Sequence, residues 1–129
     1  MKKKFVFLGD TNSINIELIC NSHKFLKNKI QYILLGNIND LSRYLIKTRS
    51  KLTINQINDP FKFDNFNKDY LNIFNIENVS NQKYLNLLNQ IKIANHLANS
   101  LKLDLVTMPI DKSIFKKKNK LYWNDRVFF

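Results

Sequence analysis

Residues 103–115 have the sequence LDLVTMPIDKSIF, and they decide which class of fold the chain can form. The apolar run over 103–106 predicts a short buried strand. Pro109 fixes its own φ and disfavours helical backbone at the residue before it, so the strand has to end at this turn. A helix can begin near Asp111, because an aspartate side chain is a good acceptor at a helix N-terminus. A strand, a tight turn and a helix in this order are typical of an α/β protein.

The turn in this stretch is also a candidate ligand site. In α/β proteins, ligands meet the chain at the carboxyl ends of strands, and Lys112 adds a positive charge there. The same pattern suits an ordinary connection with a solvated lysine, because such turns occur in every α/β domain. The local sequence leaves both interpretations open.

The residues before this stretch predict a long helix over 81–101, for which Ser80 is a suitable cap. Its apolar side chains recur every three or four positions. They are Leu85, Leu88, Ile91, Ala94, Ala98 and Leu101, backed by Leu87 and Leu97. The strand at 103–106 follows this helix at once, which gives the second half of the chain a helix-strand alternation.

The first half of the chain shows the same alternation. Strands are predicted at 4–8 and 31–35, and helices are predicted at 14–28 and 40–48. The first helix is expected to be capped by Asn12 or Ser13, and it has helical spacing at Ile14, Glu17, Leu18 and Phe25. The second helix is expected to face inward through Leu41, Tyr44 and Leu45. Near-continuous apolar runs such as the one at 31–35 are typical of parallel sheets.

The middle third is less regular. Leu52, Ile54 and Ile57 partly alternate and predict a third strand, and the alternation over 70–74 predicts another. No linker rich in Gly, Pro or Ser interrupts the chain. We therefore expect residues 1–129 to form a single α/β domain of three layers, with a mostly parallel sheet flanked by helices.

The charge of the chain is strongly positive, with 21 basic and 10 acidic residues and a formal net charge of +11. Such a charge suggests a nucleic-acid partner. However, only three of the basic residues are Arg, and they are spread along the chain. The abundance of Lys, Asn, Ile, Phe and Tyr together is what codon drift in an A+T-rich genome produces. We therefore do not favour nucleic acid. The lysine cluster at 116–120 suits a solvated face, and charge alone does not choose between a phosphate-bearing small molecule and a weak nucleic-acid contact.

The chain shows no membrane or secretion signal. No apolar run reaches the roughly 20 residues that span a bilayer. The apolar run after the first lysines, residues 5–8, is shorter than the about 7–15 residues of a signal peptide. Cys20 is the only cysteine, and it is expected to pack inside a helix. We therefore expect a cytoplasmic protein with no membrane partner.

No self-standing catalytic signature occurs in the sequence. There is no glycine-rich phosphate loop, no serine nucleophile elbow and no metal-binding cluster of Cys or His. His23 and His96 lack a His, Asp or Glu three or four positions further on, so each is expected to be a surface or interface histidine. Asp10 and Glu17 suit either a carboxylate pair at a strand-helix junction, or a cap and a solvated side chain.

Two stretches resemble motifs of a known enzyme family. Residues 9–18, GDTNSINIEL, resemble the GDPAGIGPEI stretch of the 4-hydroxythreonine-4-phosphate dehydrogenases of vitamin B6 biosynthesis. Residues 105–114, LVTMPIDKSI, are similar to the LVTGPINKxx stretch of the same family. The order of the expected elements also agrees, over nearly the whole chain, with a looser middle third.

The resemblance implies a fold and an activity. The fold would be the N-terminal part of a longer one, like that of isocitrate and isopropylmalate dehydrogenases. The family's reaction is an NAD-linked, metal-dependent oxidation of 4-phosphooxy-threonine on the route to pyridoxal phosphate, carried out by a dimer with active sites at the subunit interface. The residues carried over as substrate-binding positions are Asp10, Glu17, Thr107, Pro109 and Lys112.

The chain also departs from the family's motifs. Thr11, Ser13, Asn15, Ile16 and Met108 stand where the family has Pro, Gly, Gly, Pro and Gly. Glycines in such turns supply positive φ or close backbone approach, so side chains now occupy space that the family keeps open. The family's GHTE motif would fall at residues 124–127, which are NDRV and lack the substrate-binding His and Thr. The family's metal-binding histidines and most of its cofactor site lie in a region of the family's longer sequence that has no counterpart in these 129 residues.

We therefore expect a truncated or degenerate relative of this dehydrogenase that is inactive alone. No catalytic residue, metal ligand or bound cofactor is expected for this chain by itself, whereas the family uses NAD and a divalent metal. One alternative is a small α/β module that binds a phosphorylated metabolite through Lys112 and the lysines of 116–120. Another is one half of a split enzyme, completed by a second polypeptide, and a homodimer is a further expected assembly. A basic nucleic-acid binder is the least favoured alternative.

Overall fold

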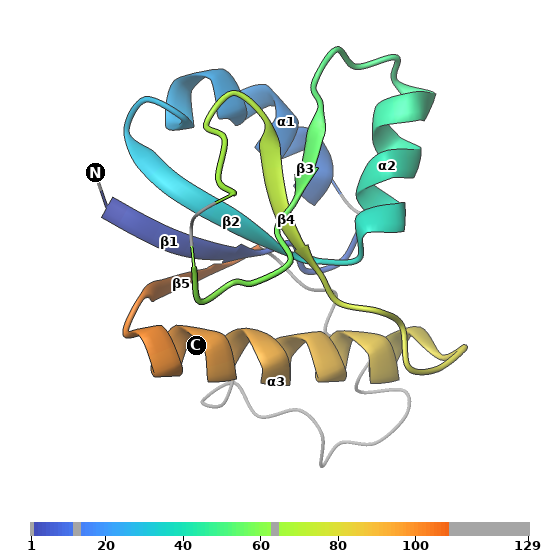
Figure 1. The fold of residues 1–129 in the computed structure, drawn as a ribbon. Helices are drawn as coiled ribbons and strands as arrows, with labels where there is room; N and C mark the ends of the chain where they lie inside the picture. The colour runs from blue at the N-terminus through green and yellow to red at the C-terminus, as the bar shows by residue number, and fades with distance from the viewer. Residues whose placement is uncertain (1, 12–13, 63–64, 109–129) are drawn as a thin grey trace.

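A five-stranded sheet forms the centre of the protein, and all of its strands are parallel (Figure 1). The computed structural model describes residues 2–11, 14–62 and 65–108. In chain order, its elements are β1 (Lys2–Phe7), α1 (Asn15–Leu26), β2 (Ile30–Gly36), α2 (Ile38–Lys47), β3 (Ile54–Gln56), β4 (Leu71–Asn75), α3 (Lys83–Leu101) and β5 (Asp104–Thr107). The strands lie in the order β3-β4-β2-β1-β5. The predicted order of helices and strands is confirmed over the described residues.

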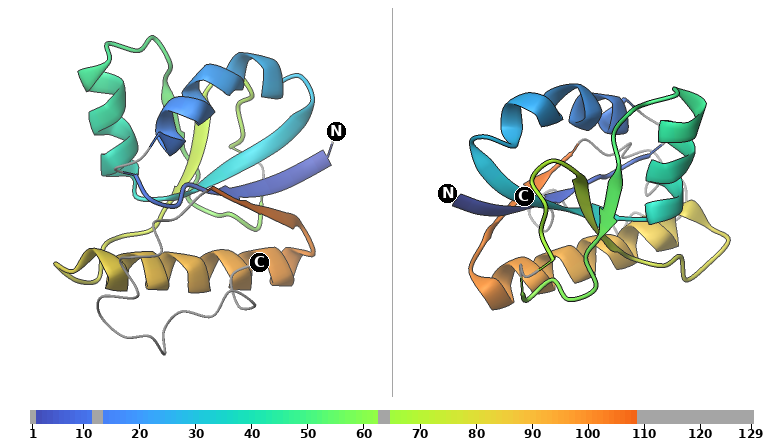
Figure 2. Two further views of the ribbon diagram at one scale, coloured as in Figure 1. Left: turned by 180° about the vertical axis from the view of Figure 1, so that it is seen from behind. Right: turned by 45° about the horizontal axis from the view of Figure 1, so that its top comes forward.

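Helices cover both faces of the sheet, so the fold has three layers, as expected. Helices α1 and α2 lie on one face and α3 lies on the other (Figures 1 and 2). Successive side chains of a strand point to opposite faces. Phe5 and Phe7 of β1 therefore pack in the core beneath α3, while Val6 and Leu8 pack in the core beneath α1 and α2. Because both faces of the sheet are covered, the second half of β1 and most of β2 are continuously apolar.

The close pairing of the central strands requires a small residue at the end of β2. A Cβ atom placed on Gly36 would lie 2.9 Å from Leu8 Cδ1, and the Leu8 side chain is fully buried. Leu8 also donates its backbone N–H to the carbonyl of Leu35 at 3.0 Å, which continues the pairing beyond β1. Glycine at position 36 therefore lets the ends of β1 and β2 approach each other.

Helix α1 lies where it was predicted, but the predicted apolar face is wrong. Ile14 and Phe25 are 63% and 64% exposed, whereas Ile16 and Ile19 are buried against the sheet. Two stripes of apolar residues run along this helix, and both have helical spacing. Periodicity alone does not say which stripe meets the sheet, because that depends on how the chain enters the helix from β1. Cys20 is half-buried in the helix as expected, and burial raises the pKa of its thiol.

The predicted helix caps also need correction. Helix α1 begins after Ile14 without a side-chain cap, and Asn12 and Ser13 lie outside the described residues. The residue that precedes α3 is Gln82 rather than Ser80. The Ser80 hydroxyl instead accepts a hydrogen bond from the backbone N–H of Gln82 at 3.0 Å, so it shapes the loop before the helix.

Strand β5 differs from the buried strand that its sequence predicts. It pairs with β1 on one side only and forms an edge of the five-stranded sheet. Leu105 packs against the core under α3, while Asp104 and Val106 are exposed on the other face. The apolar run is therefore half-buried, because α3 covers only one of its faces. The helix predicted from Asp111 lies outside the described residues.

Within the described part of the chain, no helix has both the length and the apolar character that crossing a membrane requires.

Candidate functional site

A cleft opens where the chain leaves the carboxyl ends of neighbouring strands. Strands β2 and β4 are adjacent, but the chain continues from β2 into α2 on one face and from β4 towards α3 on the other. In open parallel sheets, ligands bind at such a divergence. The cleft has a volume of about 360 Å³. Its lining residues are Gly9, Thr11, Asp40, Arg43, Asn78, Ser80, Asn81, Lys83, Asn86, Leu87 and Gln90.

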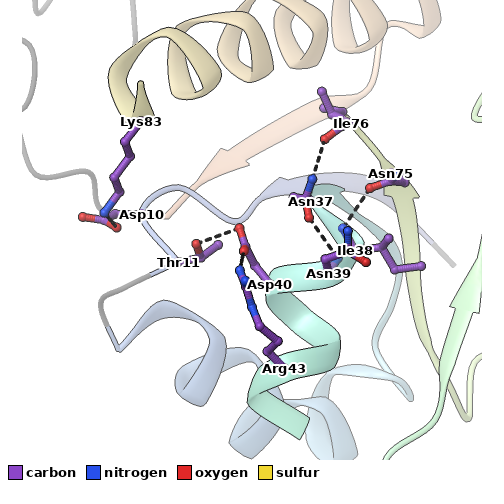
Figure 3. A network of polar contacts seen from close by, with 10 residues as sticks. All are labelled: Asp10, Thr11, Asn37, Ile38, Asn39, Asp40, Arg43, Asn75, Ile76 and Lys83. Carbon is purple, nitrogen blue, oxygen red and sulfur yellow. Dashed lines mark hydrogen bonds and ion pairs between the residues drawn. The ribbon is translucent and has the colours of Figure 1, made fainter. Parts of the chain in front are cut away.

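Asp10 holds one wall of the cleft in place through Lys83 (Figure 3). Lys83 Nζ lies 2.7 Å from Asp10 Oδ1, and Asp10 is only 6% exposed. Gly9, which precedes Asp10, has a φ of 69°, a left-handed conformation that favours glycine. The glycine turn thus directs Asp10 towards the first residue of α3.

A second series of polar side-chain contacts connects the loop after β1 to α2. The Thr11 hydroxyl donates a hydrogen bond to Asp40 Oδ2 at 3.0 Å, and Arg43 forms an ion pair with Asp40 Oδ1 (Figure 3). Asp40 and Arg43 are three residues apart in α2, so they share one face of the helix. The cleft therefore has a cation on each of two helices, with a carboxylate beside each cation.

Two asparagines fasten α2 to the end of β4 (Figure 3). Asn37 caps α2 by accepting a hydrogen bond from the Asn39 backbone N–H at 2.9 Å, and its Nδ2 donates to the Ile76 carbonyl at 3.3 Å. Asn75 Oδ1 accepts from the backbone N–H of Ile38 at 2.8 Å. These bonds fix the N-terminus of α2, which lies beside the cleft, relative to the end of β4.

Asn15 fills the turn between β1 and α1. Its Nδ2 donates to the carbonyl of Leu8 at 2.9 Å and to that of Asp10 at 3.4 Å, and the residue is buried. The family motif that this turn resembles has glycine at this position. The asparagine side chain stabilises the turn by satisfying backbone carbonyls, in space that a glycine would leave open.

Gln90 is a buried polar residue on the inner face of α3. It is 5% exposed and lines the cleft, and no hydrogen bond joins its side chain to any residue in the part of the chain that the structure describes. The buried face of α3 is centred on Leu87, Ile91 and Ala94. The predicted stripe through residues such as Leu85 is only partly buried, so the helix is turned relative to the prediction.

The two histidines have different environments, and neither lines the cleft. His23 is buried, with Nδ1 2.5 Å from the Tyr32 hydroxyl, while His96 is exposed on α3. Burial lowers the pKa of His23 and raises the pKa of Tyr32. Across the described ranges, no three His, Cys, Asp or Glu side chains form a group that could hold a metal ion.

The structure separates the site residues that the sequence suggested. Asp10 lies beside the cleft, but Glu17 is exposed on the first turn of α1. Thr107 ends β5 and lines a different, much smaller space beside Phe7. Pro109 and Lys112 lie outside the described residues, as do the lysines of 116–120. A role of these residues in substrate binding stays a prediction.

Sequence reasoning missed most of the cleft. Asp40, Arg43, Lys83 and Gln90 come from two helices, and no short motif contains them. One signal was available for Gln90, because a polar residue interrupts the apolar face between Leu87 and Ala94. The other three are charged residues on helices, and their sequence context resembles that of any solvated position.

The fold of this chain also occurs in proteins of known structure. The chain matches no family model and no curated protein. Three solved structures resemble it. A 4-hydroxythreonine-4-phosphate dehydrogenase from Burkholderia phymatum has a TM-score of 0.74 and 16% identity, over 90% of this chain and 38% of that one. A putative 4-hydroxythreonine-4-phosphate dehydrogenase from Salmonella typhimurium has a TM-score of 0.70 and 16% identity, over 90% of this chain and 40% of that one. The 4-hydroxythreonine-4-phosphate dehydrogenase from Klebsiella pneumoniae has a TM-score of 0.73 and 18% identity, over 91% of this chain and 40% of that one.

The chain thus spans about 40% of the length of these neighbours. At this level of identity, the likeness shows the fold. The expected resemblance to part of the fold of these dehydrogenases is confirmed.

Proposed function

We propose that the cleft between α2 and α3 binds a phosphorylated amino acid or a close relative of one. We also propose that the chain is a partial and diverged relative of 4-hydroxythreonine-4-phosphate dehydrogenases. One observation carries the proposal. Lys83 and Arg43 stand on two different helices, and both line the same cleft, each beside a carboxylate.

The charges of the cleft suit a molecule that carries both signs. A phosphorylated amino acid has anionic phosphate and carboxylate groups and a cationic ammonium group. Lys83 and Arg43 can each contact an anionic group, and Asp40 can accept a hydrogen bond from the ammonium group. Asp40, Lys83 and Asn86 belong to the first turns of α2 and α3 and line the cleft, where the positive ends of the two helix dipoles favour an anion.

The size of the cleft supports a small metabolite. Ligand pockets range from about 300 to 1,000 Å³, and a volume of about 360 Å³ lies at the lower end of that range. The names of the three neighbouring structures supply the ligand class, because each is called a 4-hydroxythreonine-4-phosphate dehydrogenase. The proposal transfers this class of substrate to the present chain.

We assign no oxidation step to the described residues. The family resemblance implies a divalent metal and NAD, but no group of three potential metal ligands exists within residues 2–11, 14–62 and 65–108. The carboxylates beside the cleft, Asp10 and Asp40, are each already paired with a cationic side chain. These residues do not fit the metal. The proposed role is therefore ligand binding, with no turnover by this chain alone, and the proposed location is the cytoplasm.

Isothermal titration calorimetry of the purified chain tests the proposal. We expect 4-phosphooxy-L-threonine to bind and L-threonine, which lacks the phosphate, to bind at least tenfold more weakly. Lys83→Gln and Arg43→Gln should each weaken binding about tenfold, which is the effect of losing one charge-assisted hydrogen bond. Lys92→Gln is a matched control, because it removes a charge from an exposed position of α3 outside the cleft. Absence of binding, or equal effects of all three variants, would refute the proposal.

A separate assay tests the absence of turnover. The chain is mixed with 4-phosphooxy-L-threonine, NAD and a divalent metal, and NADH is followed by its absorbance. We expect no NADH above the level of a protein-free control. Clear turnover by the chain alone would overturn this part of the proposal while leaving the binding site in place.

A further inference from the structure

Gln90 is an anomaly in the architecture of the cleft. Buried polar side chains nearly always have hydrogen-bond partners, because an unpaired buried amide loses its hydration without compensation. Gln90 is 5% exposed and lines the cleft, and its side-chain amide has no hydrogen-bond partner among the residues that the structure describes, so what remains accessible of the amide faces the cleft. Its buried helix neighbours Leu87 and Ile91 belong to the apolar core under α3, so Gln90 stands where that core meets the cleft.

The other buried amides of the described residues, Asn15, Asn37 and Asn72, each form at least one side-chain hydrogen bond. Asn37 bonds to the backbone of Asn39 and Ile76. Asn86, one helical turn before Gln90, accepts hydrogen bonds from the backbone N–H groups of Val79 and Ser80 and donates to the Ser80 carbonyl. The Asn86 amide is therefore engaged with the protein's own loop, whereas the Gln90 amide is open to the cleft.

The position of Gln90 relative to the charged residues suggests what it contacts. Lys83 and Gln90 both line the cleft and are seven residues apart on α3, which corresponds to a rise of about 10 Å along the helix axis. A ligand held at its phosphate by Lys83 would extend along α3 towards Gln90. The part of the ligand that reaches Gln90 is then the end opposite its phosphate.

We propose that Gln90 determines the specificity of the cleft, by forming a hydrogen bond between its side-chain amide and a hydroxyl or carboxylate oxygen of the ligand distant from its phosphate. The inference rests on the proposed function and identifies the group that discriminates among phosphorylated ligands. An unpaired amide favours ligands that bring such an oxygen, because a bound ligand without it would cover the amide and leave it without a hydrogen bond.

Two pairs of ligands separate the two kinds of oxygen. 4-Phosphooxy-L-threonine and O-phospho-L-homoserine differ only in a hydroxyl group, and O-phospho-L-homoserine and 3-aminopropyl phosphate differ only in a carboxylate. We expect the wild-type chain to prefer the first member of at least one pair tenfold or more in calorimetry. Gln90→Leu should reduce that preference to about one. Asn89→Leu is the matched control, because Asn89 is the adjacent amide of α3 and does not line the cleft.

The stability of the ligand-free protein provides a second readout. Gln90→Leu should leave the thermal midpoint unchanged or raise it, because the amide that it removes forms no hydrogen bond with the described residues and the leucine adds apolar contact beside Leu87 and Ile91. A lowered midpoint with an unchanged preference would show that Gln90 is structural and would overturn the inference. If the wild type binds these ligands and Gln90→Leu preserves both preferences, only the inference fails. If the wild type binds none of them, the proposed function fails and the inference falls with it.

Discussion

Lys83 Nζ lies 2.7 Å from Asp10 Oδ1, and this ion pair joins the first turn of α3 to the loop that follows β1 (Figure 3). The two residues are 73 positions apart in the sequence; Asp10 follows a strand of the sheet, and Lys83 begins the helix on one of its faces. Asp10 is almost fully buried, while Lys83 is 39% exposed at its side chain. The pair therefore combines a structural role, at its buried carboxylate, with a cation that remains accessible from the cleft.

Removing the buried member of this pair should destabilise the protein. We expect Asp10→Ala to lower the free energy of unfolding in urea by about 1–3 kcal/mol, because the loop after β1 loses a charge-assisted hydrogen bond. Asp104→Ala provides the comparison, since it breaks the Lys4–Asp104 pair at a carboxylate that is 76% exposed. That change should cost less than about 1 kcal/mol. Equal losses for the two variants would contradict the difference in burial.

Asn37 should contribute to stability through both ends of its amide. Asn37→Ala removes the cap of α2 and the bond to Ile76, and we expect a loss of about 1–2 kcal/mol in urea unfolding. Asn37→Asp keeps the oxygen that accepts from Asn39 but loses the Nδ2 donor, so its loss should be smaller. If Asn37→Asp were as damaging as Asn37→Ala, the bond to the end of β4 would matter more than the cap.

The buried His23 should make stability depend on pH. Burial lowers its pKa in the folded state below the unfolded value of about 6.5, so the unfolded chain binds the proton more readily. Stability should therefore be highest above about pH 6.5 and should decrease as the pH falls from there towards the folded pKa. Chemical unfolding at several pH values between 8 and 5, roughly spanning that range, measures this slope.

A variant isolates the contribution of His23. His23→Gln keeps a side chain that can bond the Tyr32 hydroxyl but cannot titrate, so it should flatten the slope. His96→Gln alters an exposed histidine of α3 and serves as the control. A slope that persists in His23→Gln and disappears in His96→Gln would disprove the assignment.

Gly36 should tolerate a side chain poorly. A methyl group there would lie 2.9 Å from Leu8 Cδ1, in a fully buried part of the core. We expect Gly36→Ala to reduce the free energy of unfolding by about 1–3 kcal/mol through overpacking. The double variant Gly36→Ala with Leu8→Val should lose less than the sum of the single changes, since the smaller Val makes room. Strict additivity in this double-mutant cycle would argue that the strain lies elsewhere.

The sequence predicted the candidate site only in part. Asp10 was carried over from the motif that follows the first strand, and it lies beside the cleft. Glu17 and Thr107 were carried over from the same motifs, yet Glu17 is exposed on α1 and Thr107 ends the edge strand β5. Lys83 and Gln90 belong to a different segment, and nothing near them in sequence indicates that they meet Asp10 and Thr11.

The sequence by itself determined the order of helices and strands and the parallel character of the sheet. Apolar runs, helical spacing and turn residues act over a few positions, so these features are visible locally. The tertiary structure alone decided which stripe of α1 is buried, how much of β5 is covered, and which side chains line the cleft. Thr11 and Asp40 are 29 positions apart, and they meet because β1 and β2 pair side by side. Strand pairing brings distant carboxyl ends to one edge, and only then do their loops form a site.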